Sequence, residues 1–358
     1  MVIGECEVLR GYYGVKPKCS SLCGKLISYP KGGCLIAHTA LVLEELRGIK
    51  ESVVKVITNV FMKTLRTKRR FNVNIEDWFK HTEHINGYLS NLLELAVLFH
   101  DIGKVSNGYI NSSVRSRGFR HEFSSWIHFL YVKGEFHKEL SVPKEVIELA
   151  DKYGVYDQVA LAILLHHESR LWASLEESPI LNDVMYEASS ILRRVWLRGG
   201  RSRYLLLNIN LLDDFIKGLE SVQGDLVSNN ILDTLRRLRS KYTDLSTSLN
   251  DLVPEYIERL NRYGYRNLGN CRIALMSYYV LFLVDNRAAS CREGIQQYWW
   301  LGFKEVQEKL KDIHKYDYFL RYLSRRLKGH TFHISLSLIP VSYTHLRAHE
   351  TEADLVCR

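Results

Sequence analysis

The stretch Leu95–Lys104, "LAVLFHDIGK", ends an apolar run with a histidine, an aspartate and, three residues later, a lysine. Burying an unpaired carboxylate is costly, or it shifts the pKa until the group becomes neutral. A helix that carries His100 and Asp101 to a buried end therefore requires partners that compensate their polar atoms. The rest of the chain supplies candidates for these partners.

The same pattern recurs in other apolar runs. The run "VALAILL" ends in His166 and His167, and the run "YYVLFLV" ends in Asp285. His38 lies on the apolar face of "CLIAHTALVLEEL", and His121 begins the run "HEFSSWIHFLYV". We therefore expect several helices to bring histidines and carboxylates to one point inside a helical bundle.

A divalent metal is the economical compensation for such a set of side chains. Imidazole and carboxylate ligands together suit first-row divalent ions, and one aspartate can bridge two of them. Lys104 lies one turn from His100 and Asp101, where its ammonium can neutralise an oxyanion or a phosphate. The sequence thus predicts one or two divalent ions, with Asp101 and Lys104 as catalytic residues.

Length and composition set the class of protein. The chain has 358 residues, of which 46% are hydrophobic, as in a globular protein with a real core. The sequence shows neither a membrane span nor a secretory signal, and seven irregularly spaced cysteines do not form a disulfide framework. We expect a soluble cytoplasmic protein that does not bind membranes, and the net charge of +9 favours an anionic partner.

Helical periodicity runs through almost the whole chain, so we predict an all-α fold. Residues 1–34, rich in Gly and Cys, look like short strands and loops. The main domain is expected over residues 35–290, with a probable inserted helical subdomain at 171–270 and further helices at 291–339. The tail 340–358 contains "VSYTHLRAHETEADLVCR", which resembles a translated sequencing adapter, so we expect the natural sequence to end near Ile339.

The ordered motifs "HDIGK", "FRHE", "LLHHE" and "DNRAAS", together with His38, resemble the HD superfamily of metal-dependent phosphohydrolases. Within it they are most similar to the HD nuclease associated with type I CRISPR systems. The resemblance spans His38 to Ser290, although the family is usually more compact between the double histidine and the last aspartate. It implies an HD-domain helical bundle around a metal site.

The resemblance also implies how the ligands are shared. One ion would be held by His38, His100, Asp101 and Asp285, and the other by Asp101, His121, His166 and His167. Histidine-rich ligation favours Mn, Co, Ni or Fe, and the family also permits Mg. The implied function is cleavage of single-stranded DNA in CRISPR interference, an antiviral defence, with the interference helicase and the RNA-guided surveillance complex as partners.

Several alternatives stay open. The same metal core could serve a nucleotide or cyclic-nucleotide phosphohydrolase, or this chain could be the HD portion of a longer effector large subunit or helicase fusion. His128 lies on the same face as His121 and is a rival ligand, and Asp285 could instead pair with Arg287. The basic run before His121 is either a solvated loop or a phosphate-binding element that uses Arg115, Arg117 and Arg120.

Overall fold

The computed structural model describes Leu26, Ser28 and residues 34–67, 82–111, 119–167, 186–190, 192–194, 201–221, 227–264 and 272–298. Every named element within these ranges is a helix, and a β-bridge joins Ser106 to Leu207. The prediction of an all-α fold is confirmed. The expected strands and loops of residues 1–34 lie almost entirely outside the described residues, as do residues 299–339 and the tail 340–358.

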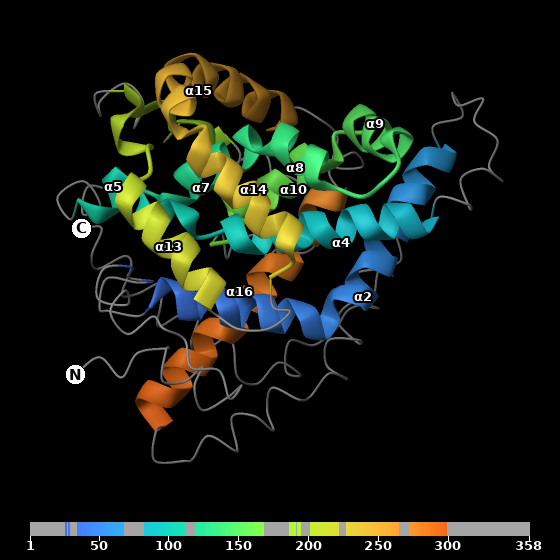
Figure 1. The fold of residues 1–358 in the computed structure, drawn as a ribbon. Coiled ribbons are helices and arrows are strands. Elements are labelled where there is room, and N and C mark those ends of the chain that lie inside the picture. The colour runs from blue at the N-terminus through green and yellow to red at the C-terminus, as the bar shows by residue number, and fades with distance from the viewer. Residues whose placement is uncertain are drawn as a thin grey trace.

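The centre of the fold is a set of long helices that pack on one another (Figure 1). Helix α2 (Leu35–Thr67) lies against α4 (Thr82–Phe99), and α16 (Arg272–Tyr298) packs against α2. Helix α10 (Val155–Leu165) packs against α16, α7 (His121–Tyr131) and α4. Helices from distant parts of the chain therefore lie side by side in this bundle.

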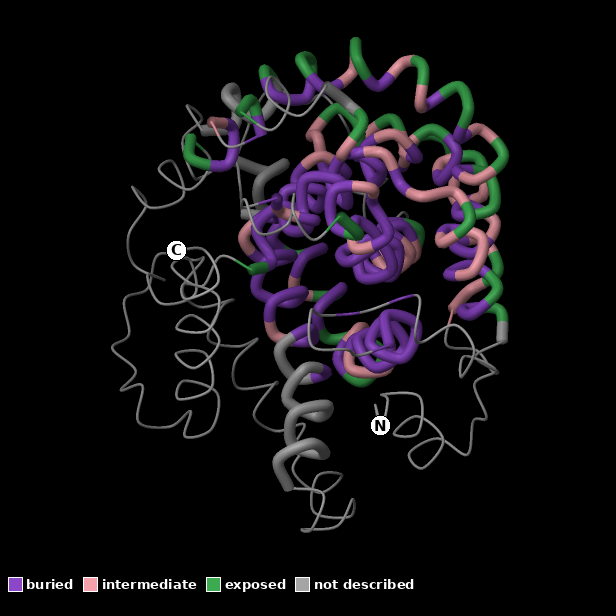
Figure 2. Tube along the Cα trace, turned by 90° about the vertical axis from the view of Figure 1, so that its left-hand side faces the viewer, coloured by how far each residue is buried: buried purple, intermediate pink, exposed green. Residues whose placement is uncertain are grey.

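Helix α10 is surrounded by the other helices. Each of its residues except Asp157 is buried, which explains why its sequence is apolar all round and lacks a polar face. Gly154, with φ 61°, joins α10 to α9 (Lys144–Lys152). This left-handed turn favours glycine, because a side chain would be strained there. The tube in Figure 2 shows the central segments buried and the exposed residues on the outer helices.

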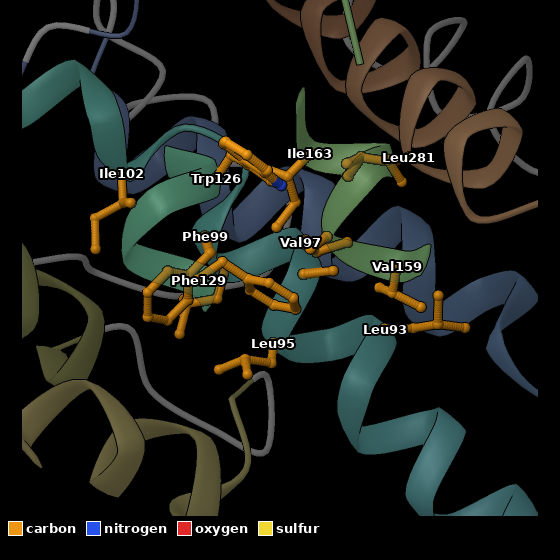
Figure 3. Close-up of a cluster of buried hydrophobic side chains, with 14 of the residues drawn as sticks. Leu93, Leu95, Val97, Phe99, Ile102, Trp126, Phe129, Val159, Ile163 and Leu281 are labelled. Atoms are coloured by element: carbon orange, nitrogen blue, oxygen red, sulfur yellow. The ribbon is translucent and has the colours of Figure 1, made fainter. Parts of the chain in front are cut away.

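Aromatic side chains pack in the hydrophobic core at the end of α4 (Figure 3). The ring of Phe99 meets that of Phe129 edge-on at 5.8 Å, and Phe129 stacks on Tyr156 at 4.6 Å. The Tyr156 hydroxyl donates to the Phe129 carbonyl oxygen at 2.6 Å, so this buried phenol is satisfied. Because Phe99 directly precedes His100, this packing holds the end of α4 in place.

Helices within the predicted insertion 171–270 pack directly on the central bundle. Helix α13 (Ile209–Ser221) contacts α2, α14 (Asn229–Ser240) contacts α8 (Lys133–Glu139), and α15 (Tyr242–Gly264) contacts α7. Their apolar faces join the same hydrophobic core. The described parts of this segment therefore share one core with the bundle.

The basic residues of α14 are neutralised within the fold. Arg237 pairs with Glu139, Lys241 just after the helix lies 2.7 Å from Glu135, and Arg236 lies 2.7 Å from Glu220. These pairs join α14 to α8 and α13. The positive charge that the sequence concentrates here is thus largely balanced by neighbouring carboxylates.

Helix α16 is longer than the apolar run that predicts it. It continues past Asp285 to Tyr298, so it runs through the expected domain boundary at residue 290, and Asp285 lies within the helix. Among the described residues, no helix combines the length and apolar character that a membrane crossing requires.

Candidate metal centre

The predicted metal ligands come from separate elements of the bundle. His38 lies in the first turn of α2, His121 is the first residue of α7, and Asp285 lies within α16. His100 and Asp101 join α4 to the 3-10 helix η1 (Ile102–Val105), and His166 and His167 directly follow α10.

These side chains form two groups, and within each group the ligand atoms all lie within 4.8 Å of one another. The inner group consists of His38, His100 and Asp285, and the outer group of Asp101, His121, His166 and His167. All the metal ligands that the sequence predicts belong to one of these groups. Each group combines imidazole and carboxylate, and could hold a metal ion.

The inner group is buried and tightly arranged. His38 Nε2 lies 2.9 Å from Asp285 Oδ1, and His100 Nε2 lies 3.6 Å from the same oxygen. The rings of His38 and His100 are tilted to each other at 5.6 Å. The ligand atoms therefore converge on one point that the core shields from water.

Asp101 connects the two groups, because each of its carboxylate oxygens faces one of them. Oδ1 lies 2.9 Å from His121 Nε2 and 3.7 Å from His166 Nε2. Oδ2 lies 3.3 Å from His38 Nε2 and 3.4 Å from His100 Nε2. An aspartate placed in this way has the geometry to bridge two ions.

Two of the histidines are oriented by their own helices. His100 Nδ1 lies 2.5 Å from the Val97 carbonyl oxygen, and His166 Nδ1 lies 2.6 Å from that of Ile163. A proton on each Nδ1 leaves the Nε2 lone pair directed into the centre, as in metal-ligating histidines. Both Nε2 atoms are buried, and neither has a hydrogen-bond partner among the described residues. Buried acceptors aimed at a common point fit a bound cation.

Lys104 touches the bridging aspartate. Its Nζ lies 2.6 Å from Asp101 Oδ2, and only 9% of its side chain is exposed. Burial would lower the pKa of Lys104, but the charge of Asp101 outweighs this and raises it. Burial would raise the pKa of Asp101, but Lys104 and His100 hold it well below its usual value. Asp101 is therefore ionised and acts as a strong acceptor for cations.

Carboxylates also act on His38. Burial alone would lower the pKa of this imidazole, but hydrogen bonds with Asp101 and Asp285 raise it to about 9. The position of its Nε2 is therefore one that attracts positive charge.

The outer group is the more accessible one. The side chain of His167 is 41% exposed, whereas His166 and Asp101 are exposed by at most 1%. Tyr109, in α5 (Asn107–Ile110), places its ring edge-on to His121 at 5.4 Å. Among these ligands, His167 is therefore the one most open to solvent.

Close packing of η1 on α7 brings Asp101 to His121. The main-chain N–H of Gly103 donates to Ser125 Oγ at 2.8 Å, and η1 packs along the start of α7. The glycine of "HDIGK" therefore has a local role, because it allows the two backbones to approach closely.

Of the two rival histidines, His121 joins the centre and His128 does not. His128 is buried, its Nδ1 lies 2.7 Å from the Ser124 carbonyl oxygen, and its ring stacks on Tyr242 at 5.9 Å. It is a hydrogen-bonded core residue.

The predicted phosphate-binding arginines are only partly placed. Arg115 and Arg117 lie outside the described residues. Arg120 is described, and its guanidinium pairs with Glu122 at 3.1 Å. Sequence reasoning assigned no role to Glu122, although it belongs to the "FRHE" motif; its position directly after a predicted ligand was the available signal.

Comparison of the chain with protein-family models, with curated proteins and with solved structures finds no match. The resemblance to HD phosphohydrolases therefore rests on the ordered motifs of the sequence.

Proposed function

We propose that this protein is a metal-dependent phosphodiesterase that cleaves single-stranded DNA. The observation that carries the proposal is the position of Asp101, whose two oxygens face two separate groups of ligands. Two ions a few ångströms apart are the arrangement that many phosphatases and nucleases use for in-line displacement at phosphorus. A single buried histidine or carboxylate would support no such reaction.

The residues of the centre have distinct tasks in this proposal. The inner and outer groups would hold the ions, which when bound activate water and withdraw charge from the phosphate. Asp101 keeps the two groups in register because each of its oxygens faces one of them. Lys104 would direct its ammonium to a non-bridging oxygen of the scissile phosphate, where it stabilises the charge that develops in the transition state.

Charge and access support a nucleic-acid substrate. The net charge of +9 favours a polyanion, and the basic run directly precedes His121 in the sequence. Arg115, Arg117 and Arg120 are the proposed contacts to the DNA backbone. The exposure of His167 provides a side from which a strand can approach.

The sequence resemblance extends the proposal to the cellular setting. In it, the protein acts in the cytoplasm in type I CRISPR interference, beside the interference helicase and the RNA-guided surveillance complex. The helicase separates DNA strands and thereby supplies the single-stranded substrate. Mn, Co, Ni, Fe and Mg are the candidate ions.

The decisive experiment measures metal content and cleavage together for wild type, Asp101→Asn and Glu94→Gln. Asp101→Asn preserves shape and removes the bridging charge, so ion content and cleavage of single-stranded DNA should both be lost. Glu94 is a buried carboxylate in α4 that accepts hydrogen bonds from Ser228 and Lys50. Its substitution should change neither the ion content nor the cleavage of single-stranded DNA. Full cleavage by Asp101→Asn in Mn-containing buffer would refute the proposed centre.

The same preparations decide between substrates. They are incubated with single-stranded DNA and, separately, with nucleoside triphosphates and cyclic nucleotides. Hydrolysis of the small nucleotides alone would replace the nuclease with the rival phosphohydrolase, which uses the same metal chemistry.

A further inference from the structure

Glu122 is a buried carboxylate to which the proposed reaction gives no task. It is 4% exposed, and its two oxygens face different neighbours. Oε2 lies 3.4 Å from His121 Nδ1, while Oε1 accepts from Nε and Nη2 of Arg120 at 3.2 and 3.1 Å. Glu122 thus lies between a guanidinium and the outward-facing nitrogen of a predicted ligand.

The two ring nitrogens of His121 face different carboxylates. Nε2 faces the metal centre, 2.9 Å from Asp101 Oδ1, and Nδ1 faces Glu122. In metal sites the ring nitrogen that does not bind the ion usually donates to a carboxylate or a carbonyl oxygen. This contact fixes the tautomer and makes the ligand more basic.

His121 differs in this respect from two other histidines of the centre. His100 and His166 are oriented by main-chain carbonyl oxygens of their own helices. His121 begins its helix, so no preceding turn of α7 can supply such an oxygen. Glu122 instead offers a charged side-chain oxygen, which lies 3.4 Å from His121 Nδ1.

We propose that Glu122, fixed by Arg120, is a positioning residue that keeps His121 Nε2 directed at the outer group and strengthens ion binding there but not in the inner group. This inference rests on the proposed metal centre. Arg120 acts indirectly, because its two donors occupy Oε1 and so turn Oε2 to the imidazole.

Glu122→Gln tests the inference because Gln has the same size but only one acceptor oxygen. Arg120 would bind that oxygen, and the amide N–H₂ would then face His121 Nδ1. Nδ1 would have to accept, which places the ring proton on Nε2 and blocks it as a ligand. In the double variant Arg120→Met/Glu122→Gln the Gln oxygen is free to turn to Nδ1, so ion binding should be partly restored.

The measurement is Mn²⁺ binding by calorimetry and by electron paramagnetic resonance, with thermal unfolding as a check on the fold. In Glu122→Gln the outer-group Kd should rise about 10- to 100-fold, and the inner-group Kd should not change. An Asp285→Asn background disables the inner group and so assigns the remaining affinity to the outer one. Glu94→Gln, a substitution of a comparably buried and paired carboxylate, is the matched control.

The outcomes separate the inference from the proposed function. If wild type binds no Mn²⁺, the metal centre itself is wrong. If wild type binds two ions and Glu122→Gln binds them with unchanged Kd values, or loses both equally, the role of Glu122 is overturned while the centre stands. If Glu122→Gln does not fold, the double variant Arg120→Met/Glu122→Gln decides. An outer-group Kd for Mn²⁺ between that of wild type and complete loss of binding supports the role of Glu122. An outer-group Kd equal to that of wild type, or no outer-group binding at all, overturns it.

Discussion

A Cβ atom added at Gly103 would lie 2.0 Å from the main-chain oxygen of His121. Atoms cannot approach so closely, so any side chain at this position must push η1 away from α7. Because Asp101 and His121 lie on these two elements, the contact between their side chains depends on the glycine between them. The "G" of "HDIGK" therefore shapes the candidate metal centre without being one of its ligands.

Gly103→Ala should damage both stability and ion binding. Overpacking of this kind costs about 1–3 kcal/mol of unfolding free energy. It also separates Asp101 from His121, so the outer-group ion should bind at least about tenfold more weakly. Denaturant unfolding and Mn²⁺ titration measure the two effects.

Gly134→Ala in α8 is the control for that substitution. A Cβ at Gly134 would meet no atom within 4 Å, and alanine favours helix over glycine. This variant should be as stable as wild type or more so, by up to about 1 kcal/mol. If Gly103→Ala and Gly134→Ala have the same stability and the same Kd for Mn²⁺, then η1 and α7 can separate without affecting the fold or ion binding.

Lys104→Met should have opposite effects on ion binding and on cleavage. The ammonium lies 2.6 Å from Asp101 Oδ2 and competes with a cation for that oxygen. Its removal should lower the Kd for Mn²⁺ by about threefold to tenfold, because charge repulsion is relieved. Cleavage at saturating Mn²⁺ should nevertheless fall by about 10²- to 10³-fold, since the charge that stabilises the transition state is lost.

Lys104→Arg is the matched variant, because it keeps the charge. It should retain wild-type ion affinity and recover part of the cleavage. A Lys104→Met protein with weaker ion binding would mean that the lysine supports the centre's structure and does not compete with the ion.

Removal of the ions should destabilise the protein without unfolding it. Lys104 already pairs with Asp101, and His38 already pairs with Asp285, so the buried carboxylates keep partners when a chelator is present. Each ion at 100 times its Kd adds about 2.7 kcal/mol to the unfolding free energy. Thermal unfolding with Mn²⁺ and with chelator should therefore differ clearly for wild type and hardly at all for Asp101→Asn. An equal change in melting temperature for wild type and Asp101→Asn would show that the ions bind at another site.

The sequence predicts the helical class and the approximate position of each ligand, because apolar periodicity identifies the buried end of a helix. His100, Asp101, His166 and His167 follow such ends, and the structure places His100 beside Asp101 and beside the ring of His166. That they bind metal stays a prediction. Asp285 was expected at a helix end and lies inside α16, because a ligand can project from the middle of a helix that passes the centre.

Other features depend on contacts between distant parts of the chain, which local patterns do not encode. The packing of α13 on α2 is one example, where a Cβ at Gly218 would lie 2.0 Å from the side chain of Ile36. The role proposed for Glu122 is another, because it depends on which oxygen Arg120 occupies. The choice of His121 over His128 followed from the motif context, and the structure agrees with it because His128 faces Tyr242.

His128 should make stability depend on pH below neutrality. Burial lowers its pKa to about 4 in the folded protein, although the hydrogen bond with the Ser124 carbonyl oxygen acts in the opposite direction. In the unfolded chain the pKa is about 6.5, so between these values the unfolded state binds the extra proton. This contribution to stability is therefore complete above about pH 6.5 and is lost as the pH falls toward 4. The shift corresponds to roughly 3 kcal/mol.

His128→Gln removes the titrating group and keeps a polar side chain beside Ser124 and Tyr242. The variant should be less stable than wild type at pH 8, because stacking on Tyr242 is lost. Between pH 6.5 and pH 4 its unfolding free energy should fall less steeply than that of wild type. The difference in slope should correspond to the uptake of about one proton on unfolding. Urea unfolding across this range measures the difference, with chelator present so that ion release does not contribute. Parallel pH profiles for the two proteins would show that His128 becomes protonated within the fold and that its burial imposes no such cost.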